Sequence, residues 1–151
     1  MPNYNFSSDL KIAVITEQEI ANLFREKYGH KVVSFSKDNR YDLLIETVRG
    51  KVFTVEVKED FTCEKTGNVG LEFSCRGKPS GVSVSEATHY VYKIHTPKGI
   101  RFFIIKTDTL KGMIKSGKYK AIVNGGDKDS SSLNYLFGLN VFISQATEIF
   151  I

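Results

Sequence analysis

The stretch RYDLLIETVRGKVFTVEVKEDF, residues 40–61, decides the fold of this chain. It holds two runs rich in β-branched and apolar residues, 41–48 and 51–58, on either side of Arg49-Gly50. Two such runs joined by a short glycine-containing turn are typical of a β-hairpin. The sequence therefore predicts two antiparallel strands at the centre of this stretch.

The turn also predicts which side chains of the hairpin meet. A two-residue turn pairs Val48 with Lys51 and, counting outward, places Asp42 opposite Val57, with a margin of one residue either way. Side chains alternate along a strand, so every second residue faces the same side. The apolar face then holds Phe53, Val55 and Val57, and the polar face gathers Asp42, Glu56 and Lys58.

The residue types on this polar face suit phosphodiester hydrolysis. Two carboxylates that lie close together repel each other unless a cation sits between them, and oxygen ligands suit Mg²⁺, with Mn²⁺ able to substitute. A lysine beside the metal can orient an attacking water and offset the charge that develops on a phosphate oxygen. Asp42, Glu56 and Lys58 are therefore candidate catalytic residues. A simpler interpretation is an exposed Glu56–Lys58 ion pair without function.

Asp42, thirteen further residues and then Glu56-Val57-Lys58 resemble the active-site motif of the PD-(D/E)XK nuclease superfamily. The resemblance covers about residues 16–58, and Tyr41 departs from it because the family name has Pro there. It implies an α/β, restriction-endonuclease-like core, in which helices flank a mixed sheet and the first helix precedes the hairpin. It also implies that the Val57 carbonyl joins Asp42 and Glu56 as a metal ligand. The chain looks like a small phage-type or Holliday-junction-resolvase-like member.

A first helix is predicted over residues 8–28, where apolar side chains recur at helical spacing: Ile12, Ile15, Ile20, Leu23 and Phe24. Members of this superfamily usually carry a glutamate on that helix, facing the metal. Glu17 lies on the flank of Ile20 towards Phe24, whereas Glu19 lies on the other flank. Glu17 is therefore the predicted fourth catalytic residue.

The rest of the chain predicts further strands in one mixed sheet, within one domain over residues 1–151. Thr107 or Asp108 is expected to cap a short helix. The remaining expected elements are strands at 31–35, 71–75, 89–95, 100–106 and near 140–144, a helix over 110–117, and loops over 62–70 and 124–132.

Additional site residues are predicted downstream of the hairpin. Glu72 alternates out of phase with its apolar neighbours Leu71 and Phe73, so it can add a carboxylate to the polar face. Arg76, Lys78 and Ser80 lie in a Gly-Pro loop whose basic side chains and backbone N–H groups can grip a nucleic-acid backbone; a solvated turn is an equally good interpretation.

Composition supports a DNA partner and gives no sign of a membrane partner. The formal net charge is +4 and the pI about 9.0, which favours polyanions. No long apolar run or signal-peptide pattern is present, so a cytoplasmic location is expected, in the host cytoplasm if the protein is phage-encoded. Cys63 and Cys75 are then expected to be free thiols.

These observations predict a metal-dependent endonuclease acting on duplex or branched DNA, and cutting both strands with so small a chain favours a homodimer. The sequence leaves a resolvase, a restriction-type enzyme and an exonuclease open, and it does not separate DNA from RNA. A nucleic-acid-binding module of the same fold without cleavage activity is the main alternative. A protein-interaction domain is a third.

Overall fold

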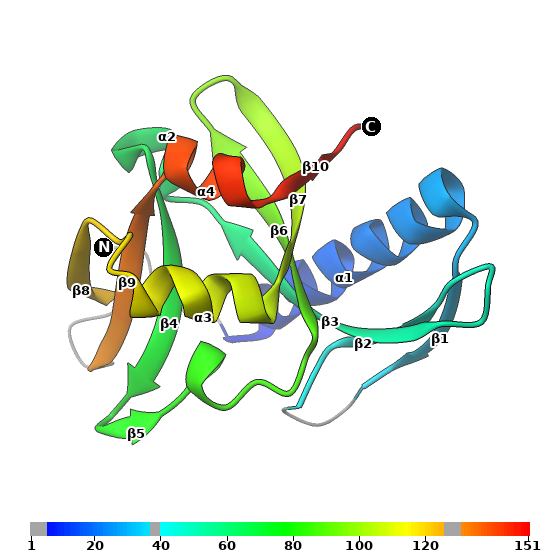
Figure 1. The fold of residues 1–151 in the computed structure, drawn as a ribbon, viewed down its shortest axis with the longest axis horizontal. Helices are drawn as coiled ribbons and strands as arrows, with labels where there is room; N and C mark the ends of the chain where they lie inside the picture. Colours follow the sequence, from blue (N-terminus) through cyan, green and yellow to red (C-terminus); the bar gives the residue numbers. More distant parts are fainter. Residues whose placement is uncertain (1–5, 37–39, 126–130) are drawn as a thin grey trace.

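The structure, a computed structural model, describes residues 6–36, 40–125 and 131–151; side chains are described from Leu10 onward. Figure 1 shows helices on both sides of a mixed sheet, which agrees with the predicted α/β class. The elements in chain order are α1 (Phe6–Tyr28), β1 (Lys31–Phe35), β2 (Leu43–Glu46), β3 (Val52–Asp60), α2 (Cys63–Thr66), β4 (Asn68–Cys75), β5 (Lys78–Pro79), η1 (Gly81–Ser83), β6 (His89–Thr96), β7 (Gly99–Lys106), α3 (Thr107–Lys115), β8 (Ala121–Gly125), β9 (Ser132–Gly138), α4 (Leu139–Gln145) and β10 (Thr147–Ile149).

Two sheets form instead of the single predicted one. The larger sheet has the order β1-β2-β3-β6-β7-β10; β3 pairs with β6 in parallel, and the other adjacent strand pairs of this sheet are antiparallel. The smaller sheet has the order β5-β4-β9-β8 and is antiparallel throughout. The chain enters the smaller sheet between β3 and β6, which explains why these two strands lie parallel.

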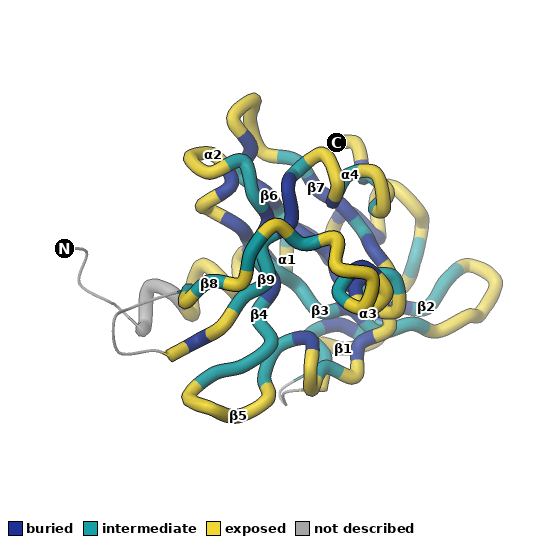
Figure 2. The backbone as a smooth tube through the Cα atoms, turned by 60° about the vertical axis from the view of Figure 1, so that its left-hand side comes forward, coloured by how far each residue is buried: buried dark blue, intermediate teal, exposed yellow. Residues whose placement is uncertain are grey.

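Each face of the larger sheet is covered by a different core. Buried side chains of α1, including Ile20 and Phe24, pack on Val55 and Val91. On the opposite face, Tyr90 and other residues of β6 and β7 pack against the smaller sheet, α3 and α4. Figure 2 shows that β6 and β7 carry much of the buried backbone. The apolar face and the polar face of β3 therefore look toward different layers.

Asp60 connects the two sheets. Its Oδ1 accepts hydrogen bonds from the backbone N–H groups of Thr62 and Cys63 and from the Thr62 hydroxyl, and its Oδ2 accepts one from Gly70 N–H at 2.9 Å. This carboxylate is buried, and these bonds offset the cost of removing it from water. Asp60 thus has a structural role: it fixes the connection through which the chain passes from β3 to β4.

Several local predictions need correction. The predicted strand at residues 140–144 lies in α4, because Phe142 is fully buried against Tyr92 and Phe103 from a helical backbone. The predicted loop over 62–70 contains α2 and the start of β4.

The predicted caps and loops differ as well. Thr107 and Asp108 do not cap α3, since Lys106 occupies the cap position and the Thr107 hydroxyl donates to the Ala87 carbonyl. In the predicted loop over 124–132, residues 124–125 end β8 and Ser132 begins β9, while 126–130 lie outside the described residues.

α1 confirms the predicted first helix, but only part of its apolar stripe is buried. Ile12 and Ile15 are exposed, whereas Ile20, Leu23 and Phe24 are buried. Among the described residues, no helix has both the length and the apolar character needed to cross a bilayer. Cys63 and Cys75 are both free thiols.

Candidate active site

Asp42 lies just before β2, where β3 runs on alone. Its backbone N–H donates to the Val55 carbonyl at 2.8 Å, and its Oδ2 accepts a hydrogen bond from Val57 N–H at 2.7 Å. Asp42 therefore sits beside Glu56, which corrects the predicted partner Val57 by one residue. The cause is the turn: Thr47 N–H donates to the Lys51 carbonyl, so the turn holds three residues instead of two.

Glu56 and Lys58 extend from β3 on the face opposite α1. Lys58 Nζ lies 3.8 Å from Glu56 Oε1, and the side chain of Glu56 is 18% exposed against 37% for Lys58. Burial, followed by the charge of Asp42, raises the pKa of Glu56 to about 7, while Lys58 opposes the rise. The Glu56 carboxyl is therefore poised to change its protonation near neutral pH.

The pKa values of the neighbouring carboxyls, Asp42 and Glu17, are also raised. Burial raises the pKa of Asp42 above its ordinary value, and the hydrogen bond from Val57 and the charge of Lys58 partly offset that rise. Burial and then the charge of Asp42 raise the pKa of Glu17. Asp42, Glu56 and Glu17 thus share one electrostatic environment in which a bound cation would be favourable.

A pocket of about 370 Å³ collects the predicted residues of the polar face. Its lining is Asp42, Glu56, Lys58, Glu72, Pro79, Ser80, Gly81, Val84 and Ser85. Glu72 comes from β4 of the second sheet, and its Oε2 accepts a hydrogen bond from the Ser80 hydroxyl at 3.0 Å. Arg76 and Lys78 are exposed and are not among the lining residues, so of the predicted DNA-binding set only Ser80 reaches the pocket.

Gly81 lets the segment after β5 close this pocket. A Cβ at Gly81 would stand 2.1 Å from the Glu72 carbonyl oxygen, and its φ is +52°, a left-handed conformation that favours glycine. Ser80 N–H and the Ser83 hydroxyl also bond to the Phe73 carbonyl. Residues 80–85 are therefore held tightly over β4 and present Ser80 to Glu72.

Tyr90 lies next to this site and is not among the residues that the sequence predicts for it. It is the register partner of Glu56 in the parallel pair of β3 and β6, and it is fully buried. Burial raises the pKa of Tyr90 to about 12; Ser85 opposes the rise and the charge of Glu56 adds to it. In the described part of the chain its hydroxyl has no hydrogen bond of normal geometry. Only the pairing of β3 with β6 would have revealed this neighbour.

Glu17 approaches from the other layer. It is half-buried on α1, the helix that packs on the Val55 face, and it interacts electrostatically with both Asp42 and Glu56. This is possible because β2 starts only at Leu43, which leaves the edge of β3 open beside Asp42. Glu19, the other candidate, pairs instead with Lys93 at 2.7 Å.

The donor groups fit a hard cation. Asp42 and Glu56 offer oxygens in a partly dehydrated pocket, and because N–H and C=O of one strand residue point to the same edge, the Val57 carbonyl faces Asp42 as well. Across residues 6–36, 40–125 and 131–151, no three His, Cys, Asp or Glu residues group closely enough to hold a metal by themselves. Mg²⁺ usually needs only one or two protein carboxylates, whereas a structural zinc needs four ligands.

No protein-family model and no curated protein matches the sequence. Among solved structures, the chain is similar to a bacterial homing endonuclease, I-Ssp6803I, with 21% sequence identity and a TM-score of 0.43. The similar region covers 62% of this chain and 66% of that chain, so it spans slightly less than two thirds of the other protein.

Proposed function

We propose that this protein is a metal-dependent nuclease that hydrolyses phosphodiester bonds of DNA, as an endonuclease on duplex or branched substrates. The observation that carries the proposal is the convergence of Asp42, Glu56 and Lys58 on one pocket at the open edge of β3. A carboxylate pair with raised pKa values next to a lysine is an arrangement suited to binding a cation and a phosphate together.

Each residue has a distinct part in the proposed reaction. Asp42, Glu56 and the Val57 carbonyl hold Mg²⁺, or Mn²⁺ in its place, and the ion supplies Lewis-acid stabilisation of the phosphate. Lys58 orients the attacking water and offsets the negative charge that grows on the phosphate oxygens. Glu17 accepts a hydrogen bond from a water on the α1 side, and Glu72 orients a second water through its pairing with Ser80.

Cleavage of supercoiled plasmid and of a four-way junction tests this proposal, with Mg²⁺, Mn²⁺ or EDTA. Asp42→Asn, Glu56→Gln and Lys58→Met remove one function each with little change in shape, and we expect each to lower the rate about 100-fold or more. Glu64→Gln, which removes an exposed carboxylate on α2, is the matched control and should cut like the wild type. DNA binding without metal-dependent cutting would favour the binding-module alternative, and no binding at low salt would favour a protein-interaction domain.

The proposal extends to a homodimer. The described part of one copy brings Asp42, Glu56 and Lys58 together at a single place, and cutting both strands of a duplex at one point needs two such sites facing opposite strands. Light scattering coupled to gel filtration, with and without duplex DNA, measures the mass directly. A monomer that makes double-strand breaks in a single binding event would contradict the dimer and leave the nuclease proposal standing.

A further inference from the structure

A second group of charged residues lies next to the site and outside the pocket. The side chain of Glu59 is only 10% exposed, and its Oε1 accepts a hydrogen bond from the Thr16 hydroxyl. His95 Nε2 lies 2.6 Å from Glu59 Oε2, and Lys93 Nζ lies 3.7 Å from the same oxygen. Glu59 therefore joins α1, β3 and β6 through polar contacts. We call Thr16, Glu19, Glu59, Lys93 and His95 the polar clamp.

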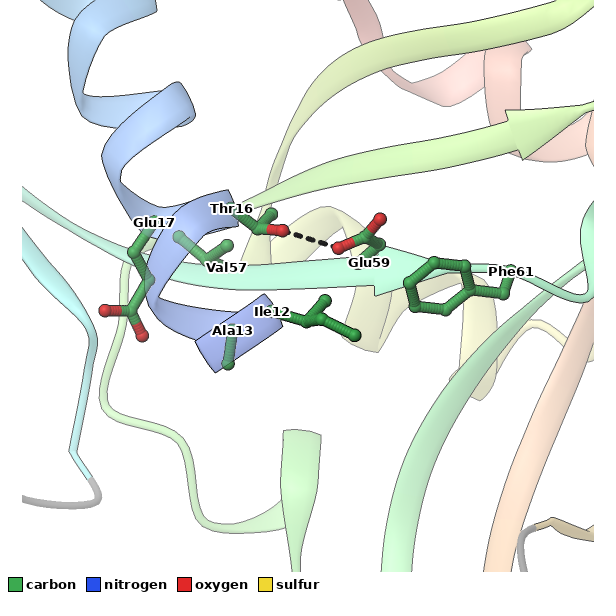
Figure 3. Close-up of a pocket in the computed structure, with 7 residues that line it drawn as sticks. All are labelled: Ile12, Ala13, Thr16, Glu17, Val57, Glu59 and Phe61. Carbon is green, nitrogen blue, oxygen red and sulfur yellow. Dashed lines mark hydrogen bonds between the residues drawn. The ribbon is translucent and has the colours of Figure 1, made fainter. Parts of the chain in front are cut away.

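The polar clamp holds α1 on both sides of Glu17. Thr16 bonds to Glu59 of β3, and Glu19 pairs with Lys93 of β6 at 2.7 Å. Figure 3 shows the Thr16–Glu59 hydrogen bond, with the Glu17 side chain extending to the opposite side of the helix. A small pocket of about 280 Å³ lies between α1 and β3 at this point, so apolar packing there is incomplete.

The polar clamp contacts α1 at the point where the exposed part of the helix meets its packed part. From Leu10 to Ile15 every side chain of the helix is exposed, Thr16 is the first buried one at 2% exposure, and the apolar contacts begin at Ile20. Glu17 thus lies between the exposed residues 10–15 and the part of the helix that packs on the sheet. Hydrophobic contacts are non-directional, but hydrogen bonds fix orientation, and one residue of rotation would swing Glu17 by about 100°.

We propose that Glu59 is a positioning residue that, through Thr16, sets the rotation of α1 so that Glu17 stays within electrostatic reach of Asp42 and Glu56. The inference rests on the proposed nuclease function, because Glu17 acts there. Glu59 touches no reacting atom. It keeps the helix in the phase that points Glu17 past the open edge of β3, and His95, stacked on Phe61 at 4.5 Å between ring centroids, holds the Glu59 carboxylate in place.

A double-mutant cycle tests the inference. Thr16→Val removes the hydroxyl and keeps the shape, Thr16→Ser restores the hydroxyl, and Glu17→Gln removes the positioned group. We expect Thr16→Val to lower the maximal rate of Mg²⁺-dependent cleavage about tenfold with an unchanged KM for DNA, and Thr16→Ser to recover it. In the Glu17→Gln background Thr16→Val should have almost no further effect, since groups that act as a unit are not additive.

A control separates positioning from a general loss of stability. Ile20→Val weakens the packing of the same helix without touching the clamp, so it should lower the Tm and keep the cleavage rate. The inference is wrong if Ile20→Val and Thr16→Val lose activity in proportion to their loss of Tm, or if Thr16→Val and Glu17→Gln are additive.

Hydrogen exchange gives a readout that does not need cleavage. Thr16→Val and Glu59→Gln should raise exchange at the amides of residues 12–19 and leave residues 21–24 protected. Unchanged exchange at 12–19 would overturn the clamp. A wild-type protein that cuts no DNA under any condition would overturn the proposed function alone, while the exchange result would still decide whether Glu59 and Thr16 hold this part of α1.

Discussion

Glu56 of β3 and Tyr90 of β6 are register partners in a parallel strand pair, so the polar face of β3 lies beside a fully buried aromatic residue. The Glu56 carboxyl is itself largely buried, and this burial is the main cause that raises its pKa. The nearby charge of Asp42 acts in the same direction, and the pKa of Glu56 reaches about 7. A buried carboxyl that is costly to ionise on its own becomes a good ligand once a cation balances its charge.

The first prediction is a pH-dependent gain of stability in Glu56→Gln. The pKa of Glu56 is about 7 when folded against 4.5 ordinarily, so between these values the folded chain keeps a proton that the unfolded chain has lost. The folded state of the wild type therefore loses stability as the pH rises from about 4.5 to about 7, by about 3 kcal/mol in total. Urea unfolding without divalent ions should show Glu56→Gln gaining most of this at pH 8 and almost nothing at pH 4.5. Glu64→Gln is the control, and parallel pH curves for Glu56→Gln and the wild type would contradict the expectation.

The second prediction concerns cation binding apart from catalysis. Since the pKa of Glu56 is raised to about 7 and the pKa of Asp42 lies above its ordinary value, Mg²⁺ should raise the Tm more at pH 8 than at pH 5.5. Binding to the folded state alone adds about 2.7 kcal/mol of stability at a Mg²⁺ concentration 100 times the Kd. Asp42→Asn should lose the shift, while added NaCl at equal ionic strength should not reproduce it. An equal shift at both pH values would place the ion elsewhere.

The third prediction compares two glycines with the same backbone conformation. Gly77 and Gly81 both have positive φ, but a Cβ at Gly77 meets no atom within 4 Å, whereas one at Gly81 meets the Glu72 carbonyl at 2.1 Å. Gly77→Ala should cost about 1–2 kcal/mol for its conformation alone. Gly81→Ala should cost clearly more in urea unfolding and should also impair cleavage, because residues 80–85 must move away from Glu72. Equal costs would mean that the close contact with β4 is unimportant.

The fourth prediction concerns the basic loop between β4 and β5. If Arg76 and Lys78 contact phosphates, the variant Arg76→Gln/Lys78→Gln should weaken DNA binding and reduce the slope of log K against log salt by about two, one for each lost contact. The matched control is Arg49→Gln/Lys51→Gln, which removes the same two charge types at the β2–β3 turn, at the other end of the molecule in Figure 1. If the two double variants show identical salt slopes, the weaker DNA binding follows from the lower net charge alone and not from contacts of Arg76 and Lys78 with phosphates.

The sequence predicts local geometry well where neighbours in space are also neighbours in the chain. Asp42, Glu56 and Lys58 come together because one hairpin holds all three and its three-residue turn sets Asp42 beside Glu56. The predicted register, with Asp42 opposite Val57, would have turned Asp42 to the apolar face, so the exact turn length decides this part of the site. Glu72 could be placed on a polar face by its alternation with Leu71, although the sheet that carries it was not foreseen. The roles of these residues stay predictions until they are tested.

Long-range pairing could not be predicted in this way. Tyr90 joins the site only because β6 pairs in parallel with β3, and Glu59 contacts Thr16 and His95, residues far from it in the chain. The residues 140–144 have the β-branched composition of a strand, yet the burial of Phe142 between two other aromatic rings favours the helix α4. In each case tertiary packing overrides the local pattern.

The parallel pairing of β3 with β6 also orders events during synthesis. A nascent chain that has emerged as far as Cys75 already carries Asp42, Glu56 and Lys58 on their hairpin. The other edge of β3 is still unpaired at that stage, because its partner β6 begins only at His89. Residues 80–85, several of which line the pocket, and Tyr90, the register partner of Glu56, follow later. Contacts between distant parts of a chain form slowly, and the N-terminal part emerges first. Prematurely released chains that end before β6 therefore carry the acidic residues without the enclosed pocket.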